Sequence, residues 1–93
     1  MRRRLLRSSA FVRAARRVVR KQPQRAEDLQ EALARLAEDA FHPQLRTHPL
    51  HGKLQGSWAC RAGYDMRIVF RFVAHEESEA ILLESVGTHD EVY

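Results

Sequence analysis

The chain has 93 residues, of which 44% are hydrophobic and 30% charged, so it fits one small globular domain over residues 1–93 and is neither collagen-like nor low-complexity. Its net charge is +4, and residues 1–25 carry ten Lys and Arg but no acid, which is compatible equally with a polyanionic partner such as nucleic acid and with a solvated surface that keeps the protein soluble. No apolar run is long enough to cross a membrane. The single cysteine, Cys60, fits a reducing cytoplasm, where we expect the protein to act.

The first half of the chain is predicted to form two helices after a short strand at Leu5 and Leu6. Ser8 or Ser9 can cap the first helix, which ends before Pro23. One face of this helix is apolar: Phe11, Val12, Ala15, Val18 and Val19. The second helix follows, with Leu29, Leu33, Leu36 and Ala40 at helical spacing and Pro43 closing the run. The short link between them predicts an antiparallel helical hairpin.

The second half is predicted to form strands. Residues 42–57 hold two Pro and two Gly and are expected to be a long loop, followed by a short strand over 58–61. Apolar and other residues alternate over 66–73, and 81–86 is a nearly continuous apolar strand that Gly87 should end, leaving a C-terminal tail. The sequence therefore predicts an α+β fold of order (β)ααβββ, with the helical hairpin packed on one face of a small, mainly antiparallel sheet.

Alternation predicts where the arginines of the sheet point. If the apolar residues of 66–73 face the helices, Arg67 and Arg71 must face the open side, because a slip of one residue would bury charge. With Trp58 directed into the core, Arg61 lies beside them. Cys60 is expected to be a small buried group.

Three motifs over residues 48–93 resemble the RelE/ParE toxin superfamily, in particular its YafQ-like branch. The run 48–56 (HPLHGKLQG) is similar to the family's HPL loop, 64–70 (YDMRIVF) to the following strand, and 86–93 (VGTHDEVY) to its GTH terminus. The order of elements also matches. The resemblance implies a RelE-like toxin of a type II toxin–antitoxin system.

The resemblance also implies site residues. The catalytic group would comprise His48, His89, Asp65, Arg67 and Tyr93, with Arg67 holding the scissile phosphate and Tyr93 stacking on or positioning the substrate. Arg61 stands where the YafQ-like branch has a further histidine. From the open face of the sheet itself, we expect RNA to be bound mainly by Arg61, Arg67 and Arg71, helped by Lys53, His51 and the arginine-rich first helix.

The implied activity is an endoribonuclease that needs no metal or other cofactor and cleaves mRNA on the ribosome. Histidines can supply the base and the acid of such a reaction, and arginine can stabilise the extra phosphate charge. Implied partners are a cognate antitoxin, mRNA and the ribosome, with operator DNA reached only through the antitoxin and no membrane. Two alternatives stay open: a ParE-like toxin that inhibits DNA gyrase, and a degenerate member that only binds its antitoxin.

Overall fold

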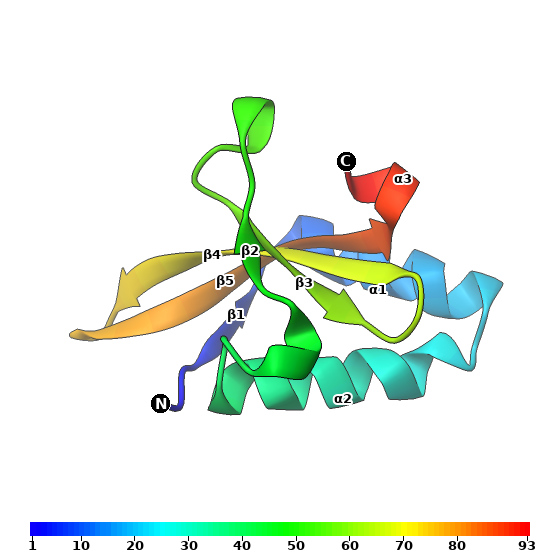
Figure 1. Cartoon of the computed structure of the whole chain (residues 1–93). Helices are drawn as coiled ribbons and strands as arrows, with labels where there is room; N and C mark the ends of the chain where they lie inside the picture. Colours follow the sequence, from blue (N-terminus) through cyan, green and yellow to red (C-terminus); the bar gives the residue numbers. More distant parts are fainter.

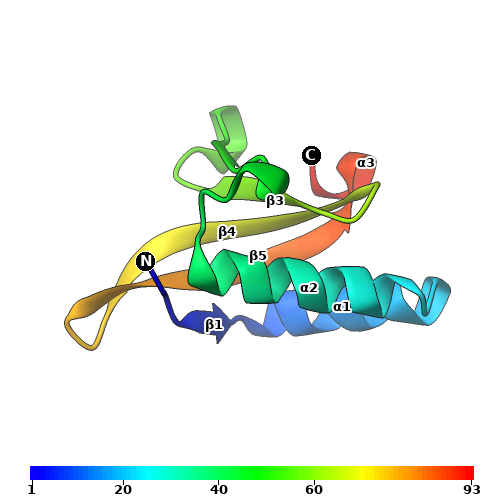
Figure 2. The same ribbon diagram turned by 60° about the horizontal axis from the view of Figure 1, so that its bottom comes forward.

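The computed structural model describes residues 1–93 and contains a five-stranded sheet with two long helices on one face (Figures 1 and 2). In chain order the elements are β1 (Leu5–Arg7), α1 (Ser9–Lys21), α2 (Arg25–Glu38), the 3₁₀ turn η1 (Pro43–Leu45), β2 (His48–Pro49), the 3₁₀ turn η2 (Gly52–Leu54), β3 (Trp58–Ala62), β4 (Met66–His75), β5 (Ser78–Thr88) and α3 (His89–Val92). The strand order is β1-β5-β4-β3-β2, and only the β1–β5 pair is parallel. The predicted α+β architecture is confirmed. None of the helices has the length and hydropathy needed to cross a membrane.

The two long helices begin and end where local chemistry dictates. The Ser8 hydroxyl accepts a hydrogen bond from the amide of Phe11 at 3.0 Å and caps α1, whose side chains Phe11, Ala14 and Val18 are buried against the sheet. Helix α2 ends at Glu38, earlier than the predicted closure at Pro43. The reason is local: the Asp39 carboxylate accepts a hydrogen bond from the amide of Phe41 at 3.1 Å, which starts a turn instead.

The segment 42–57, predicted to be a long loop, contains regular secondary structure: η1, β2 and η2. Its residues His48 and Pro49 form β2, which pairs with β3 so that His48 lies opposite Ala59. A further backbone hydrogen bond from the amide of Leu50 to Ser57 O, 2.9 Å long, closes the segment on itself. His48 is therefore held at the edge of the sheet by backbone pairing rather than carried on a free loop.

The faces of the sheet follow the alternation along β4. Met66, Ile68 and Phe70 are fully buried in the core that α1 and α2 cover. Strand β5 is longer than the predicted 81–86 and contains a bulge: Val69 pairs with Ser85, whereas Phe70 pairs with Leu83. The residue skipped by this register shift is Glu84. A bulge lets side chains three positions apart, Leu83 and Val86, both enter the core.

The β4–β5 hairpin closes through two residues in left-handed geometry. His75 pairs with Ser78, and between them Glu76 and Glu77 have φ angles of 48° and 67°. Two-residue hairpin loops with positive φ at both positions favour Asn-Gly, because a side chain with a Cβ is strained there. The loop therefore holds two glutamates in a conformation that neither favours.

We expect Glu77→Gly to raise the free energy of unfolding by about 0.5–1 kcal/mol, because relief of the left-handed strain outweighs the added freedom of the unfolded chain. Urea denaturation measures the change. The matched control is Ser78→Gly, one residue later in extended geometry, which should lower stability by about the same amount. Equal losses in both variants would contradict the strain argument.

Candidate functional site

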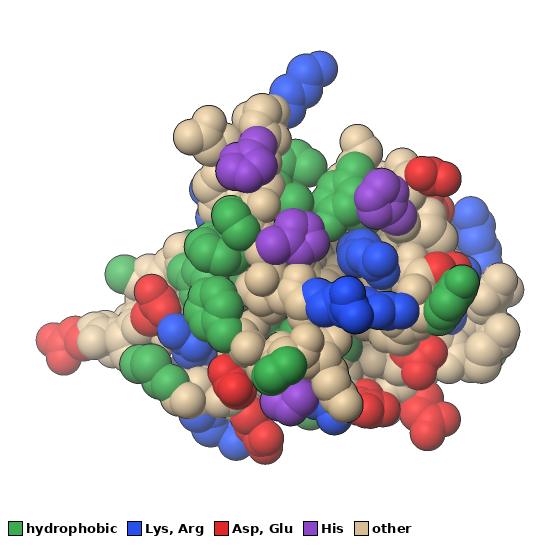
Figure 3. Space-filling model, viewed as in Figure 1, with side chains coloured by type: hydrophobic (Ala, Val, Ile, Leu, Met, Phe, Trp, Pro, Cys, Tyr) green, Lys and Arg blue, Asp and Glu red, His purple; other side chains and the backbone are tan.

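An open cleft lies on the face of the sheet that α1 and α2 leave uncovered. It has a volume of about 630 Å³ and is lined by Arg46, Arg61, Tyr64, Asp65, Arg67, Thr88, His89 and Asp90. These residues come from the segment before β2, from β3 and β4 with the turn between them, and from the C-terminal end of the chain. Lys and Arg side chains gather beside His side chains on this face (Figure 3).

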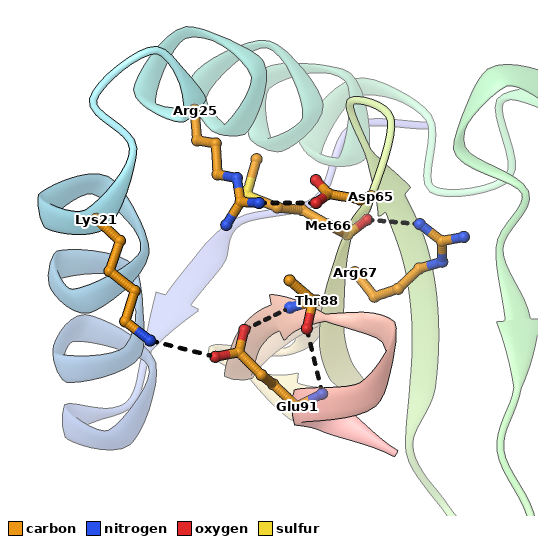
Figure 4. A network of polar contacts seen from close by, with 7 residues as sticks. All are labelled: Lys21, Arg25, Asp65, Met66, Arg67, Thr88 and Glu91. Atoms are coloured by element: carbon orange, nitrogen blue, oxygen red, sulfur yellow. Dashed lines mark hydrogen bonds and ion pairs between the residues drawn. The ribbon is translucent and has the colours of Figure 1, made fainter.

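Two arginines face the cleft because of strand register. Arg61 on β3 lies directly opposite Arg67 on β4, and both point away from the core because Cys60 and Ile68 point into it. Arg61 Nε donates to the Gly63 carbonyl at 3.1 Å. Arg67 Nη1 donates to the Met66 carbonyl at 2.9 Å (Figure 4). Neither guanidinium forms an ion pair with a carboxylate. The cleft therefore holds two adjacent, uncompensated positive charges, which favour an anionic ligand.

Both candidate histidines lie against Tyr93. The Nδ1 atom of His48 is 2.8 Å from the Arg46 carbonyl oxygen, which can only accept, so Nδ1 carries the proton in the neutral ring. The Nε2 atom of His48 is thereby left as an acceptor, 3.5 Å from the Tyr93 hydroxyl. The Tyr93 ring packs edge-on against His89, with the ring centroids 4.6 Å apart. Partial burial raises the pKa of Tyr93, an effect that the charge of Arg67 partly offsets, so Tyr93 stays a proton donor.

The C-terminal residues predicted as a tail form the short helix α3 instead. Thr88 and Glu91 make a capping box: the Thr88 amide donates to the Glu91 carboxylate at 2.8 Å, and the Glu91 amide donates to the Thr88 hydroxyl at 3.4 Å (Figure 4). The hydrogen bond from the Thr88 amide lowers the pKa of Glu91. Lys21 at the end of α1 approaches the same carboxylate at 3.9 Å. This arrangement turns the chain back over the sheet and brings His89 into the cleft lining, whereas Tyr93 and His48 lie beside the cleft, joined to it through the contact of Tyr93 with His89.

Gly87 makes this turn possible by its small size. A Cβ atom at Gly87 would lie 3.1 Å from the Cβ and Oε1 atoms of Glu91 and 3.3 Å from Val92 Cγ1. Its backbone does not have a positive φ, so space rather than backbone freedom is what requires glycine here. The predicted end of this strand at residue 86, before Gly87, is wrong by two residues, since β5 continues through Gly87 to Thr88.

Asp65 lines the cleft but also anchors the fold. Its Oδ2 atom accepts a hydrogen bond from Arg25 Nη2 at 2.7 Å, and the side chain of Arg25 is only 13% exposed (Figure 4). The pair ties the β3–β4 turn to the start of α2. Next to it, Gly63 has φ +66° and lies so close to Asp28 that a Cβ would come within 2.7 Å of Asp28 Oδ2.

Three of the predicted substrate-binding residues lie outside the cleft lining. Arg71 is on the open face, but its Nε donates to Glu84 Oε2 at 3.2 Å and its Nη2 to Ser57 Oγ at 3.2 Å. The Ser57 hydroxyl also donates to Glu84 Oε1 at 2.6 Å, so Arg71 is neutralised in a network that holds the loop before β3. Lys53 in η2 and His51 just before it are exposed on that loop.

Four cleft residues were not identified as site residues from the sequence: Arg46, Tyr64, Thr88 and Asp90. Arg46 precedes β2 in a left-handed conformation with φ 51°, and no periodic pattern singles it out. Tyr64, in the turn between β3 and β4, is 87% exposed. A single exposed aromatic residue in a turn is common on protein surfaces, so its residue type gave no signal of a binding role.

Cys60 and Trp58 belong to the core side of β3, as predicted. Cys60 is fully buried, and burial raises the pKa of its thiol to about 12 despite the opposing effect of Arg67. A thiol that stays protonated is not a nucleophile at neutral pH. Trp58 packs edge-on against Phe72 and Phe41. No three His, Cys, Asp or Glu side chains are grouped so that they could hold a metal ion.

Comparison with known proteins identifies a family to which the sequence is similar. A family model described as "Bacterial toxin of type II toxin-antitoxin system, YafQ" matches residues 3–93. Among curated proteins, none matches the sequence. Similar solved structures include YafQ from E. coli strain BL21(DE3) (TM-score 0.77, 15% identity, 99% of each chain covered). A metal-bound toxin from Helicobacter pylori has a TM-score of 0.75 and 22% identity, with 97% of this chain and 98% of that one covered. The E. coli DinJ–YafQ toxin–antitoxin complex has a TM-score of 0.74 and 16% identity, with 100% and 99% covered. At these identities, the structures share the fold.

The tight packing at Gly87 predicts that Gly87→Ala displaces α3 and exposes Tyr93, whose pKa should then fall toward the ordinary tyrosine value. Ultraviolet titration of phenolate absorbance measures this in a Tyr64→Phe background, where Tyr93 is the only tyrosine. The control is Gly52→Ala, because a Cβ at Gly52 meets nothing within 4 Å although φ is +66°. An unchanged Tyr93 pKa in Gly87→Ala would contradict the packing argument.

Proposed function

The chain belongs to the YafQ family of bacterial toxins of type II toxin–antitoxin systems, and we propose that it is an endoribonuclease that cleaves mRNA. The observation that carries the proposal is the cleft itself: two unpaired arginines lie side by side within one groove, and two histidines meet at Tyr93 at its edge. Such a groove offers cations for a phosphate and titratable groups for proton transfer.

The proposed reaction uses the 2′-hydroxyl that precedes the scissile phosphate. A histidine acting as base removes the hydroxyl proton, and O2′ attacks phosphorus. The P–O5′ bond breaks as a second group donates a proton to O5′. The products are a 2′,3′-cyclic phosphate and a 5′-hydroxyl. His48 Nε2 is suited to the role of base, because the Arg46 carbonyl holds the ring proton on Nδ1. His89, on the other side of Tyr93, is suited to the role of acid.

Other residues in and around the cleft are proposed to bind and position the substrate. Arg67 and Arg61 hold the phosphate and stabilise the charge that builds up on its oxygens. Tyr93 orients His48 through its hydroxyl and keeps its own proton, in line with its raised pKa. Asp65 uses one oxygen for Arg25 and is proposed to position the β3–β4 turn. Arg71 is not needed in this scheme, since Glu84 and Ser57 already occupy its donors.

The proposed partners follow from the same surface. An antitoxin is the expected inhibitor, as one is present in the E. coli DinJ–YafQ complex. Its inhibitory segment should be acidic, since the cleft arginines lack carboxylate partners. We propose that mRNA is cut while bound to the ribosome, and that operator DNA is reached only through the antitoxin.

The acid–base scheme predicts that His89→Ala lowers the single-turnover rate of mRNA cleavage on ribosomes by about 10²-fold or more, and His48→Ala by a similar factor. The wild-type cleavage rate should show a bell-shaped dependence on pH. Each variant should lose the side of this profile that its missing histidine produces. Binding of an RNA with a 2′-deoxy sugar at the scissile position should be unchanged in both variants. His75→Ala, on the distant hairpin, is the control. Cleavage of that 2′-deoxy RNA, or a wild-type rate for His89→Ala, would overturn the scheme.

The exposure of Tyr64 beside the cleft arginines predicts that it stacks on a base of the substrate. Tyr64→Ala should raise the toxin concentration needed for half-maximal cleavage by about tenfold or more, because one stacked base is worth about 1–3 kcal/mol. The rate at saturation should change little. Tyr64→Phe keeps the ring and should behave like the wild type. A loss in Tyr64→Phe equal to that in Tyr64→Ala would point to the hydroxyl instead.

A further inference from the structure

The outer face of α1 carries a stripe of four arginines, Arg13, Arg16, Arg17 and Arg20, which we call the α1 stripe. Their spacing of i, i+3, i+4 and i+7 places them on one side of a helix. The buried residues Phe11, Ala14 and Val18 occupy the opposite side, against the sheet. All four arginines are exposed.

No member of the α1 stripe is paired with an acid. The ion pairs of the N-terminal region use other residues, such as Arg3 with Glu79 and Lys21 with Glu91. The four arginines are therefore the largest group of uncompensated charges on one element of the fold.

The stripe works against the stability of its own helix. Like charges at i, i+3 and i, i+4 repel one another, and four such pairs occur among these residues. A bound polyanion would relieve this repulsion.

The stripe lies on the other side of the molecule from the cleft. Helix α1 covers the face of the sheet opposite the one from which β2, η2 and α3 rise (Figure 2). The expectation that the arginine-rich first helix helps the sheet arginines to hold the same substrate would therefore require that substrate to reach both sides of the molecule. A nucleic-acid strand in the cleft cannot lie along the outer face of α1 unless it wraps around the protein.

We propose that the α1 stripe is a second binding site, for the phosphate backbone of double-helical RNA. The choice of RNA rests on the proposed function, because a toxin that cuts mRNA on the ribosome works among RNA helices. The stripe spans about 10 Å along the helix axis, a length over which a double helix presents several phosphates. The site anchors the toxin on structured RNA while the cleft on the opposite face stays free for a single strand.

A nucleic-acid ligand fits the stripe better than a protein partner does. Protein interfaces are centred on exposed aromatic or large apolar side chains. The exposed large hydrophobic residues of this chain are Met1, Phe41, Tyr64 and Tyr93, none of them on α1. Guanidinium groups bind phosphate oxygens through paired donors without needing an apolar anchor.

The test measures binding of a blunt RNA duplex by fluorescence anisotropy over a range of KCl concentrations. Arg13→Gln/Arg17→Gln should weaken binding by about tenfold or more and reduce the slope of log K against log salt by about 0.9 for each phosphate that the protein no longer neutralises. The matched control is Arg2→Gln/Arg4→Gln, which removes the same charge from exposed arginines outside α1 and should have a clearly smaller effect.

Cleavage assays separate this proposal from the proposed function. In Arg13→Gln/Arg17→Gln the concentration for half-maximal cleavage on ribosomes should rise, with the rate at saturation unchanged. If the wild type cuts no RNA, the endoribonuclease proposal fails, whereas duplex binding through the stripe can still be measured. Equal losses of duplex binding in the two double variants would mean diffuse electrostatics and overturn the second site. Intact duplex binding with loss of antitoxin binding would assign the stripe to a protein partner instead.

Discussion

Burial of one face of β4 is the constraint on which the rest of the structure depends. Met66, Ile68 and Phe70 must be covered by α1 and α2, so Arg67 is forced to the open face. The pairing of β3 with β4 then places Arg61 directly opposite Arg67. A shift of one residue in this register would bury both guanidinium groups without partners and expose the core, at a cost that exceeds the stability of a small domain. The cationic cleft is thus a by-product of core formation.

Helix α3 at the C-terminal end of the chain supplies the remaining residues of the site. This short helix is held in place by close packing at Gly87, by the capping box of Thr88 and Glu91, and by Lys21 at the C-terminal end of α1. Through it, residues that are about forty positions apart in the chain meet: Tyr93 lies between His48 and His89. The two long helices are therefore linked to the residues around the cleft by two ion pairs, Lys21–Glu91 and Arg25–Asp65, as well as through the core.

Charge alone does not decide which arginines act. Arg71 shares the open face with Arg67, but the bulge in β5 turns Glu84 toward it, and Ser57 completes a closed network. Arg25 is likewise occupied, by Asp65. Apart from Arg7 on β1, the arginines left without acids fall into two groups on opposite sides of the sheet, one around the cleft and one along α1. This division gives a small protein two separate surfaces for a polyanion.

Local patterns in the sequence determined the elements and the faces of the sheet: the apolar spacing in α1 and α2, the alternation in β4, and therefore the outward direction of Arg61 and Arg67. The motifs at His48 and His89 also indicated the family. Tertiary structure alone decided which of these groups meet. The pairing of β2 with β3 sets the place of His48, the close approach at Gly87 turns the predicted tail into α3, and the shift between Val69 and Phe70 gives Arg71 its acidic partner. Periodicity reports contacts within an element, whereas these outcomes depend on contacts between residues distant in the chain, which no local pattern encodes.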